Sequence, residues 1–186
     1  GEYSHSKRTN LFVNPQGIVA DDDSYSKEGI ASAFVEYGRQ IGKASLQAGV
    51  RYEHVAFDYY IKNIHRKDMS RTTDDLFPSL GLSFPIGKVQ MQLGYAKDIL
   101  RPSFSQLSGE VTYNNRYTYQ TGNPLLLPMT TDNISLNAIY RWASLSVGYQ
   151  HIKNKVFYQS IPYSEDNPSV VLFSYTNQPA YDFCFA

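Results

Sequence analysis

The sequence is poor in cysteine, in charge and in long apolar runs. Its 186 residues include one cysteine, Cys184, which excludes an internal disulfide framework and a cysteine-based zinc site. Charged residues make up only 18% of the chain and the formal net charge is zero, which argues against a nucleic-acid partner. No run reaches the ~18 apolar residues of a transmembrane helix. Membrane-spanning strands are not excluded by this, because they alternate apolar with polar residues.

Motifs for catalysis, cofactor binding and metal binding are missing too. The serines lie in no nucleophile-elbow pattern, and no glycine-rich phosphate loop follows a strand. The four histidines show no metal-ligand spacing. They are His5, His54, His65 and His151. We therefore predict that the chain is not an enzyme and holds neither a cofactor nor a metal.

The chain is rich in tyrosine, and in several segments its apolar and polar residues alternate strictly. Sixteen tyrosines raise the aromatic content to 15%. Between Asn133 and Gln150 apolar and polar residues alternate, a period typical of half-buried strands. The apolar face carries Ile134, Leu136, Ala138, Tyr140 and Trp142, then Leu145, Val147 and Tyr149. Only residues 141–144 are left for the connection, so the pattern predicts a β-hairpin.

The same pattern recurs along the chain and predicts a simple topology. Alternating segments pair across short turns near residues 40–43 and 85–88, and long polar connections follow at 58–74, 99–131 and 153–169. A turn signal also stands at 14–17. Further strands are expected at 30–39, 44–53, 79–84, 89–96 and 170–175, with one more in the tail at 180–186. We predict one all-β domain, an antiparallel up-and-down meander of about eight strands.

A short quasi-repeat accompanies the hairpins. Each copy lies in the strand that leaves a short turn and places a glycine on the polar face. The copies are Gln47-Ala48-Gly49-Val50, Gln92-Leu93-Gly94-Tyr95 and Ser146-Val147-Gly148-Tyr149.

Alternation does not say which face meets water. In a soluble sandwich or small barrel the apolar face packs inward, whereas in an outer-membrane barrel it meets lipid. Short turns at one end with long loops at the other favour the membrane. So do the apolar-face aromatics near both strand ends, which are Tyr52, Tyr95 and Tyr149 towards the loops and Tyr37, Tyr140 and Trp142 towards the turns. Ala44 to Tyr52 covers roughly 20 Å at a tilt of about 40°, close to the height of an apolar membrane band.

Charged residues on the polar face point the same way. Arg51, Glu53 and Arg141 would be costly buried charges in a soluble core, but they suit a water-filled lumen and can pair there. We therefore predict a part, or a small version, of an outer-membrane β-barrel whose lumen these three residues line. The alternative is a soluble β-barrel or sandwich that acts as a binding module, for example for carbohydrate.

The longest connection holds the one candidate ligand site. Aromatic rings beside amide and guanidinium donors suit sugars and other polar ligands. The residues are Tyr113, Asn115, Arg116, Tyr117 and Tyr119. The structural alternative is that these tyrosines only pack the loop against the rim.

Four segments, in this order, resemble one known family. They are Gly49-Val50-Arg51-Tyr52-Glu53, Leu76-Phe77-Pro78-Ser79-Leu80, Arg101-Pro102-Ser103-Phe104 and Gly122-Asn123-Pro124-Leu125-Leu126-Leu127-Pro128. Together they resemble the barrel portion of TonB-dependent receptors, specifically the outer-membrane β-barrel family abundant in Bacteroides-like bacteria. The resemblance covers roughly residues 28–160.

The resemblance carries its own expectations. It implies a bacterial outer-membrane location, contact with outer-membrane lipid, a full barrel of about 22 strands, and energised uptake of a siderophore, glycan or peptide. It also implies that residues 1–186 are a single barrel segment, because a plug domain, an energy-coupling box and the other strands are missing. A periplasmic energy-coupling protein would act through those missing parts.

Overall fold

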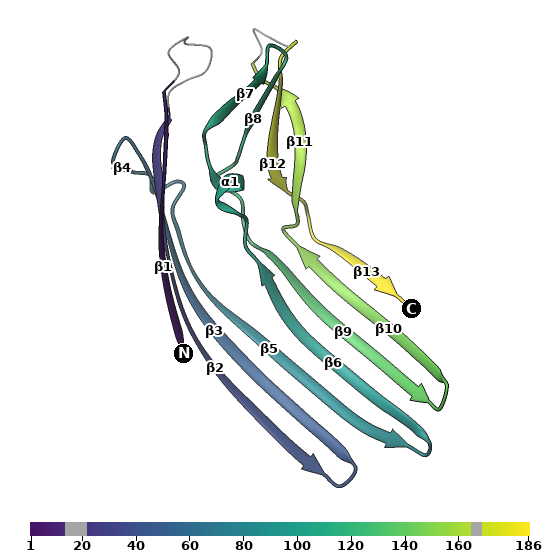
Figure 1. The fold of residues 1–186 in the computed structure, drawn as a ribbon. Helices are drawn as coiled ribbons and strands as arrows, with labels where there is room; N and C mark the ends of the chain where they lie inside the picture. Colours follow the sequence, from purple (N-terminus) through teal and green to yellow (C-terminus); the bar gives the residue numbers. More distant parts are fainter. Residues whose placement is uncertain (14–21, 165–168) are drawn as a thin grey trace.

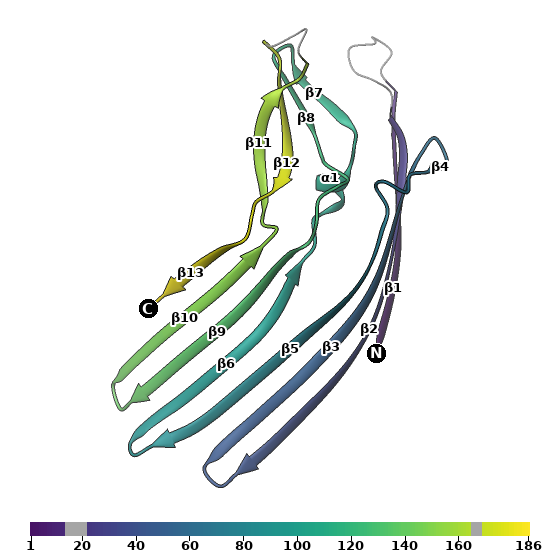
Figure 2. The ribbon, with the colours of Figure 1, turned by 180° about the vertical axis from the view of Figure 1, so that it is seen from behind.

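A computed structural model describes residues 1–13, 22–164 and 169–186, so the turn signal at 14–17 lies outside the described residues (Figures 1 and 2). Strands dominate. They are β1 (Glu2–Phe12), β2 (Asp22–Ile41), β3 (Ala44–Ile61), β4 (Ile64–His65), β5 (Arg71–Ile86), β6 (Val89–Leu100), β7 (Val111–Asn115), β8 (Thr118–Thr121), β9 (Met129–Tyr140), β10 (Ala143–Lys153), β11 (Val156–Pro162), β12 (Val171–Asn177) and β13 (Tyr181–Phe185). One short helix, α1 (Phe104–Leu107), joins them.

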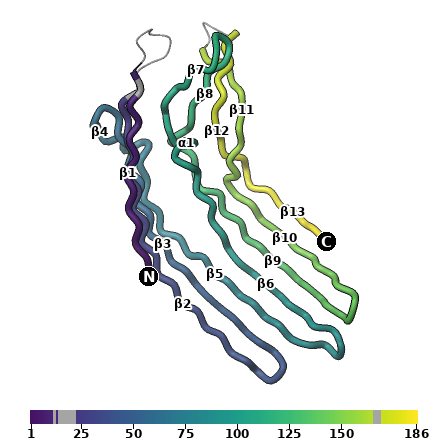
Figure 3. The backbone as a smooth tube through the Cα atoms, viewed as in Figure 1, coloured from purple at the N-terminus to yellow at the C-terminus, as the bar shows by residue number. Residues whose placement is uncertain are grey.

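The main sheet is the predicted meander. Among the described residues it has nine strands in the order β1-β2-β3-β5-β6-β9-β10-β13, and β4 pairs with β3 at the side. Every neighbouring pair is antiparallel. The sheet is curved and remains open, as a section of a barrel wall is (Figure 2). The backbone trace shows three long hairpins side by side, with their turns along one edge (Figure 3).

The three short turns lie where the sequence predicts them, and each contains only two residues. Ile41 pairs with Ala44, Ile86 with Val89, and Tyr140 with Ala143. In all three turns the first residue has a positive φ, as a type II′ hairpin turn requires. These residues are Gly42 (61°), Gly87 (61°) and Arg141 (49°).

The strands are longer, and the long connections more structured, than predicted. β3 runs to Ile61 and β5 starts at Arg71, so the connection expected at 58–74 shrinks to 62–70. The connection expected at 99–131 contains α1, β7 and β8, and the loop expected at 153–169 contains β11. The loop predicted at 58–74 began too early because the apolar residues of β3 change face after Glu53 while the strand continues.

A second, smaller sheet stands above the main one. Its order is β11-β12-β8-β7, with β12 and β8 parallel (Figure 1). Below it the core consists of Phe57 and Tyr59 from β3, Leu107 from α1, and Leu126, which is fully buried. Hydrogen bonds complete the packing, among them one from the Asn123 amide to the Tyr175 carbonyl at 3.0 Å. The small core therefore lies at the end of the sheet away from the turns.

The two faces of the main sheet differ in polarity below this core. The outer, convex face carries exposed apolar residues such as Val35 (70% exposed) and Leu145 (59%). The inner, concave face carries polar ones, for example Gln47, Gln92 and Asn137, which line a common hollow. Among the described residues, no helix is long and apolar enough to cross a membrane.

Where the apolar part of the outer face ends, tyrosine hydroxyls donate to aspartates of the neighbouring strand. The pairs are Tyr52–Asp74, Tyr95–Asp132 and Tyr149–Asp182. Histidines join two of them, because His54 Nδ1 lies 2.8 Å from Asp74 and His151 Nδ1 lies 2.7 Å from Asp182. This tyrosine–aspartate belt recurs once per hairpin, at the loop end where the sequence predicts an aromatic girdle.

The glycine quasi-repeat has a packing reason. Each glycine faces a side chain from the next strand that occupies the space of a Cβ. Gly49 faces the Ser79 hydroxyl, Gly94 faces the Ser135 hydroxyl, and Gly148 lies directly under the Phe185 ring. The repeat therefore marks close cross-strand contacts on the inner face.

Candidate functional site

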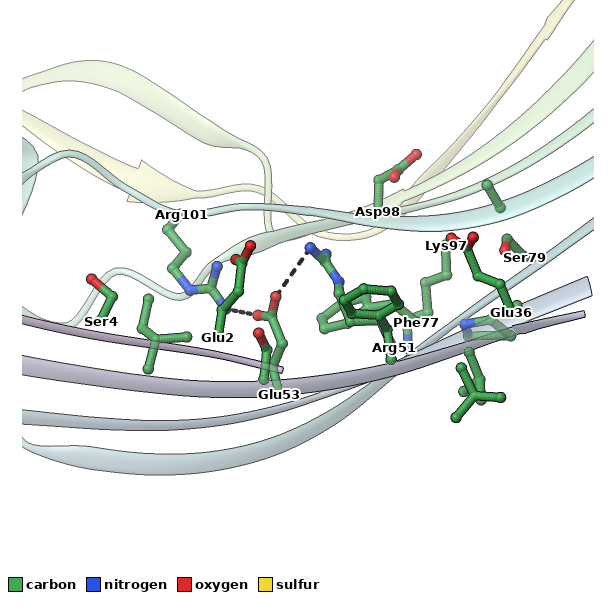
Figure 4. Close-up of a pocket in the computed structure, with 18 of the residues that line it drawn as sticks. Glu2, Ser4, Glu36, Arg51, Glu53, Phe77, Ser79, Lys97, Asp98 and Arg101 are labelled. Carbon is green, nitrogen blue, oxygen red and sulfur yellow. Dashed lines mark hydrogen bonds and ion pairs between the residues drawn. The ribbon is translucent and has the colours of Figure 1, made fainter.

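The segments that resemble the receptor family come together on the concave face. The first supplies Arg51 and Glu53 from β3, and the second supplies Phe77 from the paired strand β5. The third begins with Arg101, just after β6, whose side chain reaches back to Glu53 (Figure 4). Residues about 50 positions apart in the sequence thus form one site.

Glu53 is the centre of this site. Its side chain is only 5% exposed, and its two carboxylate oxygens form ion pairs with two different arginines. Arg51 Nη1 lies 3.2 Å from Oε1, while Arg101 Nη2 bonds Oε2. The Arg51 guanidinium also lies over the Phe77 ring, 5.0 Å from its centroid. The group carries a net positive charge, because two guanidinium groups surround one carboxylate.

A cavity of about 910 Å³ opens beside this cluster. Its wall adds charges of both signs, from Glu2, Glu36, Lys97 and Asp98 (Figure 4). Phe34 and Phe77 contribute aromatic surface. Such a mixture of charged groups and rings can bind a polar ligand from several sides.

The segment after β6 is shaped to hold Arg101 in place. Ser103 caps α1 in a capping box with Gln106, which fixes the chain two residues after Arg101. A side chain at Gly122 would overlap the carbonyl oxygens of Ser105, Gln106 and Ser108, so only glycine lets the fourth segment pass this closely. The fourth segment therefore packs against residues 105–108, which directly follow the third segment, and together they form a layer that we call the floor.

Arg71 links this floor to the sheet. Its guanidinium lies 4.7 Å from the Phe57 ring centroid and donates to the Pro124 carbonyl at 3.3 Å. Burial lowers the pKa of Arg71 from its usual value, and the nearby Glu28 opposes this shift. The group stays charged, because an arginine starts far above neutral pH.

The predicted lumen-lining residues separate into two places. Arg51 and Glu53 lie on the concave face and pair with each other. Arg141 does not lie with them, because it is the first residue of the turn between β9 and β10. Its guanidinium lies 5.5 Å from the ring centroid of Tyr140, a residue of the outer face. The alternation that placed Arg141 on the polar face ends at Tyr140.

The predicted tyrosine site maps to β7, β8 and their turn. Tyr113 and Tyr119 face each other at 5.6 Å between centroids. Tyr119 is only 8% exposed, while Tyr117 is 52% exposed with Arg116 stacked over it at 4.6 Å. The side-chain oxygen Oδ1 of Asn115 accepts from the Tyr117 backbone amide at 2.9 Å and so shapes the turn. Within this group, Tyr117 and Arg116 are open to a ligand and Tyr119 is part of the packing.

Arg101 and Phe77 are the site residues that sequence reasoning did not single out. Both lie inside segments that were noticed only for their family resemblance. A buried carboxylate needs a partner at each of its two oxygens, and Arg101 supplies the partner that Arg51 leaves open on Glu53.

Comparison with known proteins agrees with this geometry. A model of the outer membrane protein beta-barrel family matches residues 4–182, nearly the whole chain. No curated protein matches the chain.

Solved structures with a similar fold are siderophore and hemophore receptors. The siderophore receptor PirA from Pseudomonas aeruginosa has 15% identity and a TM-score of 0.51, over 87% of this chain and 38% of that one. The hemophore receptor HasR from Serratia marcescens, in complex with HasA and heme, has 14% identity and a TM-score of 0.57, over 97% and 35%. A variant of the ferric enterobactin receptor PfeA from Pseudomonas aeruginosa, in complex with enterobactin, has 14% identity and a TM-score of 0.50. The match covers 98% of this chain and 37% of that one. The chain thus spans little more than a third of these receptors, and the likeness shows a shared fold.

Proposed function

Because this chain belongs to the outer membrane protein β-barrel family and is located in the outer membrane, we propose that it forms one section of the wall of a nutrient-uptake receptor. The proposed receptor takes up a siderophore, glycan or peptide with energy delivered by a periplasmic coupling protein. That protein would act through parts of the receptor outside residues 1–186.

One observation carries this proposal. The concave face holds a paired charge cluster around Glu53, whereas the convex face of the same strands is apolar and exposed. A soluble module would have to cover that convex face, and among the described residues nothing packs on it. Lipid outside and water inside satisfy both faces at once.

The cluster also suggests how the wall would act on a ligand. Glu53 holds Arg51 and Arg101 in fixed positions, so their remaining N–H groups are presented to the cavity without a large loss of side-chain entropy. Cationic, preoriented donors favour ligands with carboxylate, catecholate, phosphate or hydroxyl oxygens. The β7–β8 turn with Arg116 and Tyr117 would make the first contact from outside.

The uptake role can be tested in the intact receptor that contains this chain. Arg101→Gln should lower ligand uptake roughly tenfold, or about 1.4 kcal/mol, because it removes one cation of the site and frees Glu53 and Arg51 from their positions. Arg39→Gln, which removes a cation from the outer face, is the matched control and should leave uptake unchanged. Unboiled gel mobility monitors whether each barrel is folded. Uptake at the wild-type rate by a folded Arg101→Gln receptor would contradict the proposal.

The membrane orientation of the faces has a separate test. Purification with and without detergent should give a folded species only with detergent, and its gel mobility should change on boiling. A monodisperse monomer in plain buffer would instead mean that the apolar face is an interior core.

A further inference from the structure

One of the three hairpin turns has a sequence that does not suit its backbone. At the first position of the turn, Gly42 and Gly87 adopt a positive φ without strain, because glycine has no Cβ. The third turn puts Arg141 at the same position with φ 49°, in a region that is unfavourable for a side chain of this size. The turn that contains Arg141 is therefore strained, whereas the turns that contain Gly42 and Gly87 are not.

Nothing within the described chain compensates for this strain. Arg141 takes part in no ion pair among the described residues, and its one ring contact is with Tyr140, 5.5 Å away at the surface. The next residue, Trp142, is 92% exposed, the highest value among the exposed large apolar residues. A strained arginine followed by an unpacked tryptophan fits a partner outside the chain.

The other two turns supply cations at the same edge. Lys43 and Lys88 occupy the second turn positions, are exposed, and have no carboxylate partner among the described residues. The hairpin halves that end at these turns contain no aspartate or glutamate at all. They are residues 37–52, 76–97 and 133–152. The carboxylates of the outer face gather instead at the tyrosine–aspartate belt, at the other end of the apolar band.

We propose that this turn edge, defined as residues 42–43, 87–88 and 141–142, binds the anionic head groups of phospholipids in the membrane leaflet that it meets. Arg141 contacts a lipid phosphate with its planar guanidinium, and Trp142 inserts its ring at the boundary between head groups and acyl chains. Lys43 and Lys88 add long-range attraction to the same charged surface. The absence of carboxylates over these hairpin halves makes the attraction uncompensated, which favours anionic over zwitterionic lipid.

The inference rests on the outer-membrane location and does not depend on nutrient uptake. Its test uses the intact receptor in neutral detergent, titrated with phosphatidylglycerol or with phosphatidylcholine, and the thermal midpoint is the readout. Phosphatidylglycerol should raise the midpoint more than phosphatidylcholine does, and the difference should shrink at high salt. Equal effects of the two lipids on the wild type would overturn the proposal.

Two variants and one control locate the effect. Arg141→Gly gives the third turn the glycine of its sisters, so the midpoint without lipid should hold or rise, while the affinity for phosphatidylglycerol should fall about fivefold, as expected for one cation near a charged surface. The double variant Lys43→Gln/Lys88→Gln should show a further loss. Lys153→Gln, which removes an exposed cation at the opposite end of β10, should bind like wild type.

The outcomes separate this proposal from the uptake proposal. If Arg141→Gly lowers the midpoint in neutral detergent, Arg141 has a structural role in the fold and the inference is wrong. It is equally wrong if Arg141→Gly keeps the full phosphatidylglycerol preference. If Arg141→Gly takes up ligand at the normal rate but loses the preference for phosphatidylglycerol, the result supports both proposals. If Arg101→Gln loses uptake but keeps the lipid preference, the result concerns only the uptake site.

Discussion

The turn end and the loop end of the same strands have opposite polarity patterns. On the turn side of Glu53, β3 places Val50 outward and Arg51 inward, whereas beyond Glu53 the inward residues are buried and the outward ones are less apolar, namely His54, Ala56, Asp58 and Tyr60. The inward set is Val55, Phe57 and Tyr59. The strand itself continues without a break in register. In the proposed membrane orientation the change reflects the surroundings, with lipid and a wet interior at the turn end, and water and a packed protein core at the loop end.

This difference shows that alternation indicates only that the two faces of a strand differ in polarity. It does not indicate which face is buried. In the membrane orientation proposed above, lipid covers the apolar face at the turn end, so this face needs no protein partner. At the loop end the apolar face needs one, and the floor formed by α1 and Leu126 supplies it. In the proposed orientation, a strand that leaves the membrane must move its apolar residues from the outward face to the inward face near the membrane surface. The tyrosine–aspartate belt lies at that level.

The largest effect is expected when one inward aromatic side chain is removed at the loop end of the sheet and, for comparison, one towards the turn end. Phe57→Ala should destabilise the loop end by about 3–5 kcal/mol, because it leaves a cavity in a closed core. The matched change Phe34→Ala removes the same side chain from the same face near the turns, where the ring is 55% exposed, and should have little effect. Denaturant unfolding together with hydrogen exchange in β2 and β3 measures both. Equal losses would mean that the two ends share one core.

A charge placed on the outer face tests the opposite side of the comparison. Leu136→Arg lies midway along the apolar band of β9 and should cost about 2–4 kcal/mol of membrane folding free energy. Thr72→Arg lies on the same face of β5 beyond the belt, where water is available, and should be neutral. Folding titrations into lipid vesicles compare the two. A tolerated arginine at position 136 would show that this face does not meet hydrocarbon.

The smallest expected effect concerns the belt itself. Tyr95→Phe deletes the hydroxyl that donates to Asp132 at 2.8 Å but keeps the ring, so the loss should be only about 0.5–1 kcal/mol. The receptor should still insert at the same depth, because the ring remains at the interface. Unfolding midpoints in vesicles give the energy. A loss as large as that of Phe57→Ala would make the belt a structural core rather than a boundary.

Much of the sheet follows from the sequence, because its hairpins are local. The three short turns, the up-and-down order and the apolar face all depend on neighbours within a few residues, and these predictions were confirmed. The length of β3 was underestimated because the outward residues turn polar after Tyr52, which looks like the start of a loop. The inward aromatics at 55, 57 and 59 carried the correct signal on the other face.

The site was harder to predict because it is built by contacts distant in sequence. Arg51 and Glu53 were recognised from charge on the polar face, but Arg101 reaches Glu53 across 48 positions, through a segment that has no strand pattern. Arg141 was assigned to the polar face because the alternation was extended past Tyr140, but Arg141 is the first residue of the two-residue turn. Tyr119 looked like its neighbour Tyr117 in the sequence, and only the packing against Tyr113 and Tyr163 distinguishes them.

The two-residue turns have a consequence for protein engineering. Because side chains alternate with a period of exactly two, one residue added to the turn at 42–43 would shift the pairing of β2 with β3 by a step and turn Arg51 towards the lipid and Val50 towards the interior. The nine residues at 62–70 separate β3 from β5 without such a register constraint, although β4 pairs with β3, the Arg66 backbone amide donates to the Tyr59 carbonyl and Met69 packs against the core. An epitope tag or a fluorophore attachment peptide therefore belongs between the exposed residues Lys67 and Asp68, at the end of the sheet opposite the short turns, and never in those turns.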